Sequence, residues 1–126
     1  MRIKIIQENP IVGDIENNKK KLFFECHKAS KENVELIVFS ELFLTGYPPQ
    51  DLLCFDSFYS HVDNAIQDIC NESKLVPELA ILVGCPIKNS KYHIYNAAII
   101  ILNGEIVFRQ NKTNLPTPHP PYQSRF

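Results

Sequence analysis

The sequence predicts an α/β fold made of one domain. Apolar strand-like runs alternate along the chain with two stretches of helical periodicity, and the last two runs flank an Asn103-Gly104 turn. The 126 residues are 44% hydrophobic and 21% charged, which is the composition of a single soluble globular domain. No internal repeat and no low-complexity linker interrupts the predicted elements, so we expect one hydrophobic core.

The first strand is predicted over residues 2–7, where the isoleucine-rich segment RIKIIQ alternates until Asn9-Pro10 ends it. A helix follows, because Asp14 has the character of an N-cap and apolar residues recur after it at helical spacing. These apolar residues are Ile15, Leu22, Cys26 and Ala29. The lysine cluster Lys19–Lys21 is placed on the other face of this helix, and we expect it to be solvated.

A second strand is predicted over residues 35–40, because ELIVFS is the short continuous apolar run typical of a strand covered on both faces. Residues 57–72 are predicted to form an amphipathic helix with one apolar stripe. The stripe consists of Phe58, Val62, Ala65, Ile66 and Ile69. Residues 79–84, LAILVG, read as another buried strand. Residues 95–110 read as a β-hairpin, since Asn-Gly between two β-rich runs is the strongest short hairpin signal.

Charge and hydropathy argue against two classes of partner. Thirteen Lys and Arg against fourteen Asp and Glu give a formal net charge of -1, so the total charge attracts neither nucleic acid nor anionic lipid. No apolar run approaches the roughly 18 residues that predict a membrane span. The N-terminal segment MRIKIIQENP turns polar too early for a secretory signal. We therefore predict a cytoplasmic protein without nucleic-acid or membrane partners.

The cysteines and histidines do not predict a metal site. The four cysteines are Cys26, Cys54, Cys70 and Cys85, and the four histidines are His27, His61, His93 and His119. Neither set has the close spacing of zinc ligands. Each cysteine lies in an apolar neighbourhood, so we predict four buried free thiols. No glycine-rich phosphate loop occurs, and no cofactor is predicted.

Glu41 raises the main functional question. It ends the apolar run LIVFSE and is followed by the turn sequence Gly46-Tyr47-Pro48-Pro49. Open α/β sheets gather ligand groups at the carboxyl ends of their strands, and Glu41 is predicted to lie at such an end. An isolated glutamate in this position more often caps a turn or forms a surface ion pair. A catalytic interpretation therefore needs support from other residues.

That support comes from four segments in a fixed order: QENPIVGDIENN, SELFLTGYPPQDLL, LVGCP and YNAAIIILNGEIV. On these segments the sequence resembles the nitrilase, or carbon-nitrogen hydrolase, superfamily, and within it the glutaminase domain of glutamine-dependent NAD+ synthetases. The resemblance covers about residues 1–116 and implies the first half of a nitrilase-type α-β-β-α sandwich. The proline-rich tail, residues 117–126, departs from the family pattern and is expected to pack poorly.

The resemblance also implies roles for individual residues. Glu41 matches the general base of a Glu-Lys-Cys triad, and Lys112 in RQNKTNLP matches the triad lysine. The base would deprotonate a thiol that attacks an amide carbon, and the lysine would stabilise the charge developing on the carbonyl oxygen. Tyr47 is expected to line the substrate pocket, although packing at a turn explains a tyrosine there equally well. We predict that Glu41 and Lys112 lie within side-chain reach of each other.

The nucleophilic cysteine of the triad is not matched. The family places it well downstream of the lysine, whereas the sequence ends fourteen residues after Lys112, with TPHPPYQSRF where the family's tyrosine and second glutamate are expected. Cys85, upstream of the lysine, is interpreted as structural. We therefore expect a truncated glutaminase domain that is inactive alone, with glutamine as substrate of the complete enzyme. The alternatives are a truncated amidase of other specificity and a non-catalytic subunit that completes its sheet with a second polypeptide or another copy of itself.

Overall fold

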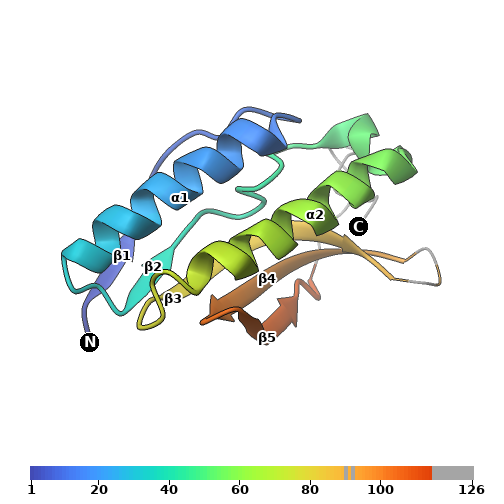
Figure 1. The fold of residues 1–126 in the computed structure, drawn as a ribbon. Helices are drawn as coiled ribbons and strands as arrows, with labels where there is room; N and C mark the ends of the chain where they lie inside the picture. The colour runs from blue at the N-terminus through green and yellow to red at the C-terminus, as the bar shows by residue number, and fades with distance from the viewer. Residues whose placement is uncertain (90, 92, 115–126) are drawn as a thin grey trace.

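The structure is a computed structural model that describes residues 1–89, 91 and 93–114. The elements follow one another along the chain in the order that the sequence predicts, with one short helix added (Figure 1). They are β1 (Ile3–Ile5), α1 (Ile15–Lys31), β2 (Leu36–Val38), the 3-10 helix η1 (Gln50–Cys54), α2 (Asp56–Ser73), β3 (Ala80–Lys88), β4 (Ile94–Leu102) and β5 (Glu105–Asn111). Because residues 115–126 lie outside the described residues, the expectation for the tail and the division after residue 116 stay predictions.

One mixed sheet has the strand order β1-β2-β3-β4-β5. The pairs β1–β2 and β2–β3 are parallel, and the pairs β3–β4 and β4–β5 are antiparallel. Both α1 and α2 lie over the same side of this sheet (Figure 1). Asp14 is the N-cap of α1, and its side chain accepts the main-chain N–H of Asn17, as the sequence predicts.

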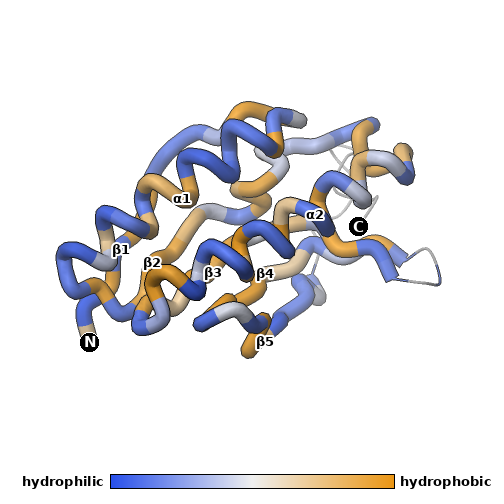
Figure 2. Tube along the Cα trace, in the orientation of Figure 1, coloured by the Kyte–Doolittle hydropathy of each residue, from blue (hydrophilic) through white to orange (hydrophobic). Residues whose placement is uncertain are grey.

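The core lies between the two helices and the sheet. Alternate strand residues point to this side, because successive side chains of a strand point to opposite faces. The strand residues in the core are Ile37 on β2, Ile81, Val83 and Cys85 on β3, and Ile99 and Ile101 on β4. In Figure 2 the strands β2–β4 are mainly hydrophobic, whereas hydrophilic residues follow much of α1. We call this side of the sheet the covered face.

The opposite side, which we call the open face, also carries apolar side chains. By strand register it is formed by Ile3, Ile5, Leu36, Val38, Leu82, Gly84, Ala98, Ile100 and Phe108. Ile3, Ile5 and Phe108 are 51%, 68% and 52% exposed. The exposed apolar side chains thus lie on the two edge strands, β1 and β5, and partly buried ones lie between them.

The expectation that the whole lysine cluster is solvated is wrong for Lys19. Its side chain is buried, whereas Lys20 is exposed. Lys19 lies one helical turn after the buried Ile15 and therefore faces α2. Its Nζ contacts Asp68 Oδ2 on α2 at 2.7 Å and Glu16 Oε1 on α1 at 2.9 Å. These two carboxylates neutralise the buried charge.

The prediction for the cysteines is confirmed for three of the four. All are free thiols, and Cys26, Cys70 and Cys85 are buried, but Cys54 is exposed. Cys54 ends η1, a helix the sequence did not predict, and that helix buries Leu53 instead. Among the described residues, no helix has the length and apolar character needed to cross a membrane.

Candidate active site

Glu41 lies in a tight turn directly after β2. Leu42, the next residue, has a φ of 53° in the left-handed region and is fully buried. Gly84 on β3 lies against this turn, and a Cβ at Gly84 would stand 2.5 Å from the Leu42 nitrogen and 3.0 Å from Glu41 Cα. Only glycine leaves room for this approach, so the backbone of Glu41 is set directly against β3.

The chain beyond Glu41 is held by the loop that precedes α1 and by the first turn of α1. Gly13 donates its N–H to Thr45 O at 2.8 Å, and the Asn18 side chain donates to Leu44 O at 3.1 Å. Gly46 has a φ of +78°, and a Cβ there would lie 2.6 Å from Val12 Cα. The resembling segments QENPIVGDIENN and SELFLTGYPP therefore pack against each other, and together they fix the turn that carries Glu41.

Lys112 meets Glu41 from the far end of the β4–β5 hairpin. Its Nζ lies 2.9 Å from Glu41 Oε1, across a sequence separation of 71 residues. The main-chain N–H of Lys112 donates to Asn96 O at 2.8 Å, which extends the β4–β5 ladder one residue past Asn111. The prediction that Glu41 and Lys112 lie within side-chain reach is confirmed.

A third residue, Asn96 on β4, completes the cluster. Its side-chain amide donates to Glu41 Oε1 at 2.5 Å, and it is only 4% exposed. Glu41 and Lys112 are 48% and 36% exposed at their side chains. An ion pair this exposed contributes about 0–1 kcal/mol to stability. Folding stability alone therefore gives little reason to bring these two charges together.

The cluster borders a hollow of about 360 Å³ on the open face. Its lining residues are Phe39, Ser40, Glu41, Leu82, Gly84, Asn96, Ala97, Ala98, Gln110 and Lys112. Half of these residues are apolar, and three of the polar ones, Glu41, Asn96 and Lys112, are in contact with one another. Apolar walls with a few convergent polar groups are typical of sites for small ligands.

Tyr47 is not among the residues that line this hollow, and it is 43% exposed. A cis peptide bond joins it to Pro48. The described residues do not test its predicted contact with substrate, which stays a prediction.

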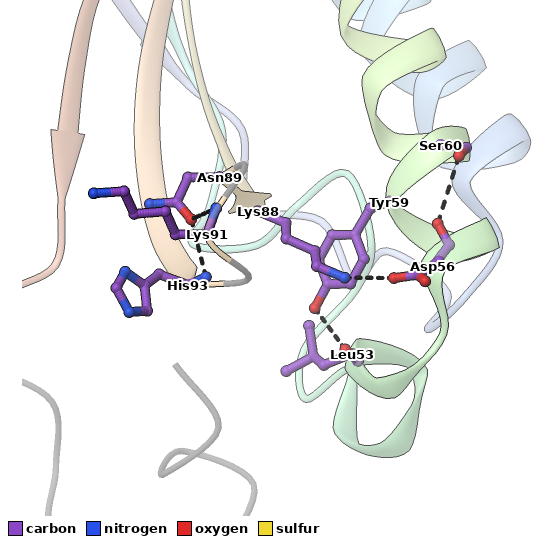
Figure 3. A network of polar contacts seen from close by, with 8 residues as sticks. All are labelled: Leu53, Asp56, Tyr59, Ser60, Lys88, Asn89, Lys91 and His93. Atoms are coloured by element: carbon purple, nitrogen blue, oxygen red, sulfur yellow. Dashed lines mark hydrogen bonds and ion pairs between the residues drawn. The ribbon is translucent and has the colours of Figure 1, made fainter.

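The segment after Tyr47 is anchored to α2 and to the end of β3 (Figure 3). Tyr59 donates its hydroxyl proton to Leu53 O at 2.6 Å, and Lys88 pairs with Asp56 while its Nζ stands 5.2 Å from the Tyr59 ring centre. The bonds hold η1 and the start of α2 against β3, the strand on which Gly84 supports Glu41.

Just before β4, an asparagine side chain holds the main chain in place. There the Asn89 side chain accepts the main-chain N–H groups of Lys91 and His93 (Figure 3).

None of the four cysteines lines the hollow. Cys85 is the nearest in sequence to a site residue, but its side chain points to the covered face and is fully buried. Burial raises the pKa of the Cys85 thiol to about 12, and the nearby Arg109 offsets only part of this rise. Burial likewise raises the pKa of Cys26 to about 12. Burial thus disfavours, in both thiols, the thiolate form that nucleophilic attack requires.

Sequence reasoning missed Asn96 and Gly84 as site residues. Both were inside segments that resemble the family, YNAAIIILNGEIV and LVGCP. Asn96 had its own signal, since asparagine is disfavoured in a strand and its neighbours in the sequence are Tyr95 and Ala97. Among the described residues, no cluster of three or more His, Cys, Asp or Glu side chains could hold a metal ion.

Comparison with known proteins matches this chain to one family over nearly its whole length. The carbon-nitrogen hydrolase family profile covers residues 2–126. The chain is 34% identical over 116 residues to the glutamine-dependent NAD(+) synthetase of Thermotoga maritima, and 30% identical over 115 residues to that of Acinetobacter baylyi. These matches cover 92% and 91% of this chain but only 20% of each relative, so the chain spans about a fifth of their length.

Solved structures agree. The glutamine-dependent NAD+ synthetase from Acinetobacter baumannii superposes with a TM-score of 0.79 at 27% identity, over 91% of this chain and 21% of that one. An amidase from Nesterenkonia sp. superposes with a TM-score of 0.84 at 23% identity, over 94% of this chain and 44% of that one, which shows a shared fold. The predicted fold class is confirmed as an α/β part of the nitrilase fold, and the chain belongs to the carbon-nitrogen hydrolase family.

Proposed function

We propose that this chain is the N-terminal part of the glutamine-hydrolysing domain of a glutamine-dependent NAD+ synthetase. The observation that carries the proposal is the contact of Lys112 Nζ with Glu41 Oε1 at the edge of a ligand-sized hollow. The identity of 34% to the Thermotoga maritima synthetase supports the choice of substrate, glutamine. In the whole enzyme the released ammonia serves the formation of NAD+.

The two charged side chains divide the chemistry between them. The Glu41 carboxylate accepts the proton of a thiol, and the thiolate then attacks the amide carbon of glutamine. The Lys112 ammonium stabilises the negative charge on the carbonyl oxygen. The proton held on Glu41 passes to the departing nitrogen, which leaves as ammonia. A water molecule then hydrolyses the thioester to glutamate and restores the thiol.

The thiol comes from outside the described residues, because no cysteine of this chain reaches the hollow. We propose that polypeptide equivalent to the rest of the domain covers the open face and brings the thiol over the hollow. The exposed Ile3, Ile5 and Phe108 on that face support this arrangement. The Nesterenkonia sp. amidase, of which this chain covers 44%, has about as much polypeptide again.

A cytoplasmic location fits the same proposal. The four cysteines are free, and structural disulfides are rare in reducing compartments.

A fused enzyme tests the proposal. Residues 1–114 of this chain replace the matching segment of the Thermotoga maritima synthetase, and ammonia release from glutamine is measured. We expect turnover in the fusion, and a loss of about 10²–10⁴-fold in Glu41→Gln. Lys112→Met should lose activity to a similar degree. Cys85→Ala serves as the matched control and should leave turnover unchanged.

The full 126-residue chain is assayed beside the fusion. We expect no ammonia release from glutamine by the chain alone, because a triad that acts as a unit loses on the order of 10⁶ in turnover without its nucleophile. Turnover by the chain alone that Cys85→Ala abolishes would identify a self-sufficient amidase and overturn the proposal. A fusion that hydrolyses a short aliphatic amide but not glutamine would overturn the choice of substrate.

A further inference from the structure

Among residues 1–89, 91 and 93–114, Asn96 is the one buried polar residue in contact with both members of the charged pair. Its side chain reaches Glu41, and its main-chain carbonyl accepts the N–H of Lys112. The strand context does not explain an asparagine here. The residues on either side, Tyr95 and Ala97, suit a β-strand, whereas asparagine is depleted in strands and needs hydrogen bonds when buried.

The two donors to Glu41 converge on a single oxygen. Asn96 Nδ2 lies 2.5 Å and Lys112 Nζ 2.9 Å from the same atom, Oε1. A carboxylate only accepts hydrogen bonds, so the nitrogen of the Asn96 amide is the atom that faces it. Neither of these two donors is hydrogen-bonded to the other carboxylate oxygen, Oε2. Oε2 is left with its lone pairs for another proton donor.

We propose that Asn96 is a positioning residue for the base, and that it commits Oε1 to the protein so that Oε2 takes the proton. This inference rests on the proposed function of Glu41. The terminal torsion of a glutamate is broad and roughly two-fold, so a carboxylate held by the lysine alone could rotate. The ammonium of Lys112 lies at the end of a long, flexible side chain, and this side chain is 36% exposed. Asn96 is buried on β4, which lies between β3 and β5, and its side chain fixes the plane of the carboxylate.

The rigidity of this anchor comes from the sheet. Asn96 lies opposite Pro86 on β3 and opposite Lys112 beyond β5. Its main-chain carbonyl bonds to the Lys112 side, so the missing N–H of Pro86 leaves that carbonyl satisfied. The same residue therefore sets both the direction of the Glu41 carboxylate and the position of the Lys112 backbone.

The first test needs no activity. In the full chain labelled with ¹⁵N-asparagine, the Asn96 side-chain amide signals are assigned by their loss in Asn96→Leu. We expect Glu41→Gln to shift these signals, because the charged acceptor has gone. Asn18 is the matched control, since it is a fully buried asparagine bonded to Ile11 and Leu44, and its amide signals should not move. If the Asn96 amide signals do not shift in Glu41→Gln, the contact between Asn96 and Glu41 is overturned.

The second test uses the active fusion. Asn96→Leu removes the donor and should lower kcat roughly 10²-fold with KM almost unchanged, since misplacement by about 1 Å costs this much. Asn96→Gln keeps an amide donor on a longer side chain and should recover at least roughly a tenth of wild-type kcat, again as a matter of placement. Rates are compared per folded molecule, as measured by circular dichroism. Ser73→Ala, which removes a buried hydroxyl from α2, is the control for stability and should keep full turnover.

The outcomes separate the two proposals. Full turnover in Asn96→Leu, or equal losses in Asn96→Leu and Asn96→Gln, would overturn the positioning role while Glu41→Gln still upholds the function. If Glu41→Gln leaves the turnover of the fusion unchanged, the proposed function is overturned. The amide signals of the full chain would still report whether Asn96 is hydrogen-bonded to Glu41 Oε1.

Discussion

On β4, Ile99 and Ile101 point toward the helices and are fully buried, whereas Ala98 and Ile100 face the open side and are only partly buried. The same alternation holds on β3, where Val83 is fully buried and Leu82 is not. One set of strands thus builds two different surfaces. The covered face is a finished core, closed by α1 and α2.

The open face carries the polar residues of the candidate site. Glu41, Asn96 and Lys112 meet at its margin, and its apolar side chains include the most exposed isoleucine of the sheet, Ile5. The difference teaches that stability and chemistry are divided between the two sides. Changes on the covered face should act on folding, and changes on the open face should act on turnover and assembly. Four experiments probe this division.

The largest effect is expected from the charged pair. In the fused enzyme, Glu41→Gln should lower turnover by about 10²–10⁴-fold, because general-base catalysis contributes that much. The same change in the full chain should alter the free energy of unfolding by no more than about 1 kcal/mol, since the pair is exposed. Ammonia release and urea titration measure the two quantities. A large loss of stability with little loss of turnover would reverse the division.

The second effect compares the two faces directly. Ile99→Ala should destabilise the isolated chain by about 2–5 kcal/mol, because it opens a cavity in a filled core. Phe108→Ala on the open face should change the free energy of unfolding by about 0.5 kcal/mol or less, as exposed positions do. Urea titrations followed by circular dichroism give both values. Equal losses would mean that the open face is already packed in the isolated chain.

The third experiment tests Gly84, an open-face residue whose substitution should act on both stability and turnover. Gly84→Ala should destabilise the chain by about 1–3 kcal/mol, because the new methyl group would overlap the backbone at Leu42. It should also lower turnover of the fusion, since the backbone of Glu41 must move away from β3. Ile99→Ala is the comparison, with loss of stability but unchanged turnover per folded molecule. Normal turnover in Gly84→Ala would show that the close approach is not needed.

The smallest effect concerns the covered side and depends on pH. Burial acts to lower the pKa of Lys19, but hydrogen bonds to Asp68 and Glu16 outweigh it, and the pKa lies above the ordinary 10.5. The stability that Lys19 contributes is therefore present below pH 10.5 and is lost as the pH rises through the folded value. Urea midpoints of wild type and Lys19→Met should converge only above that pH. Lys20→Met, an exposed neighbour, should match wild type throughout.

The sequence predicted the order of the strands and helices because each has a strong local signal. Asp14 caps α1, and Asn103-Gly104 makes the tight turn of the β4–β5 hairpin. Strand limits were less accurate. The first strand was predicted over residues 2–7 and spans Ile3–Ile5, whereas β3 extends to Lys88, four residues past the predicted end. Pairing with β4, a contact between distant residues, sets that length.

The site was predicted in part. The resemblance identified Glu41 and Lys112, and their contact is as expected. Asn96 and Gly84 were missed because their roles depend on which strands are neighbours, and no local pattern reports this. Lys19 and Cys54 were misplaced for the same reason. The carboxylate of Asp68 makes a buried lysine tolerable, and Cys54 ends η1, a helix that buries Leu53 and leaves Cys54 exposed.

The sequence separation of 71 between Glu41 and Lys112 has a kinetic consequence. Lys112 follows β5, an edge strand that is held on one side by β4. Contacts between residues so far apart form late in folding, and an edge strand is among the first parts of a native protein to open. Fraying of β5 would separate the ammonium from the carboxylate while α1, α2 and the buried strand residues stay in place. On gentle warming, the fused enzyme should lose turnover before its helical circular-dichroism signal declines.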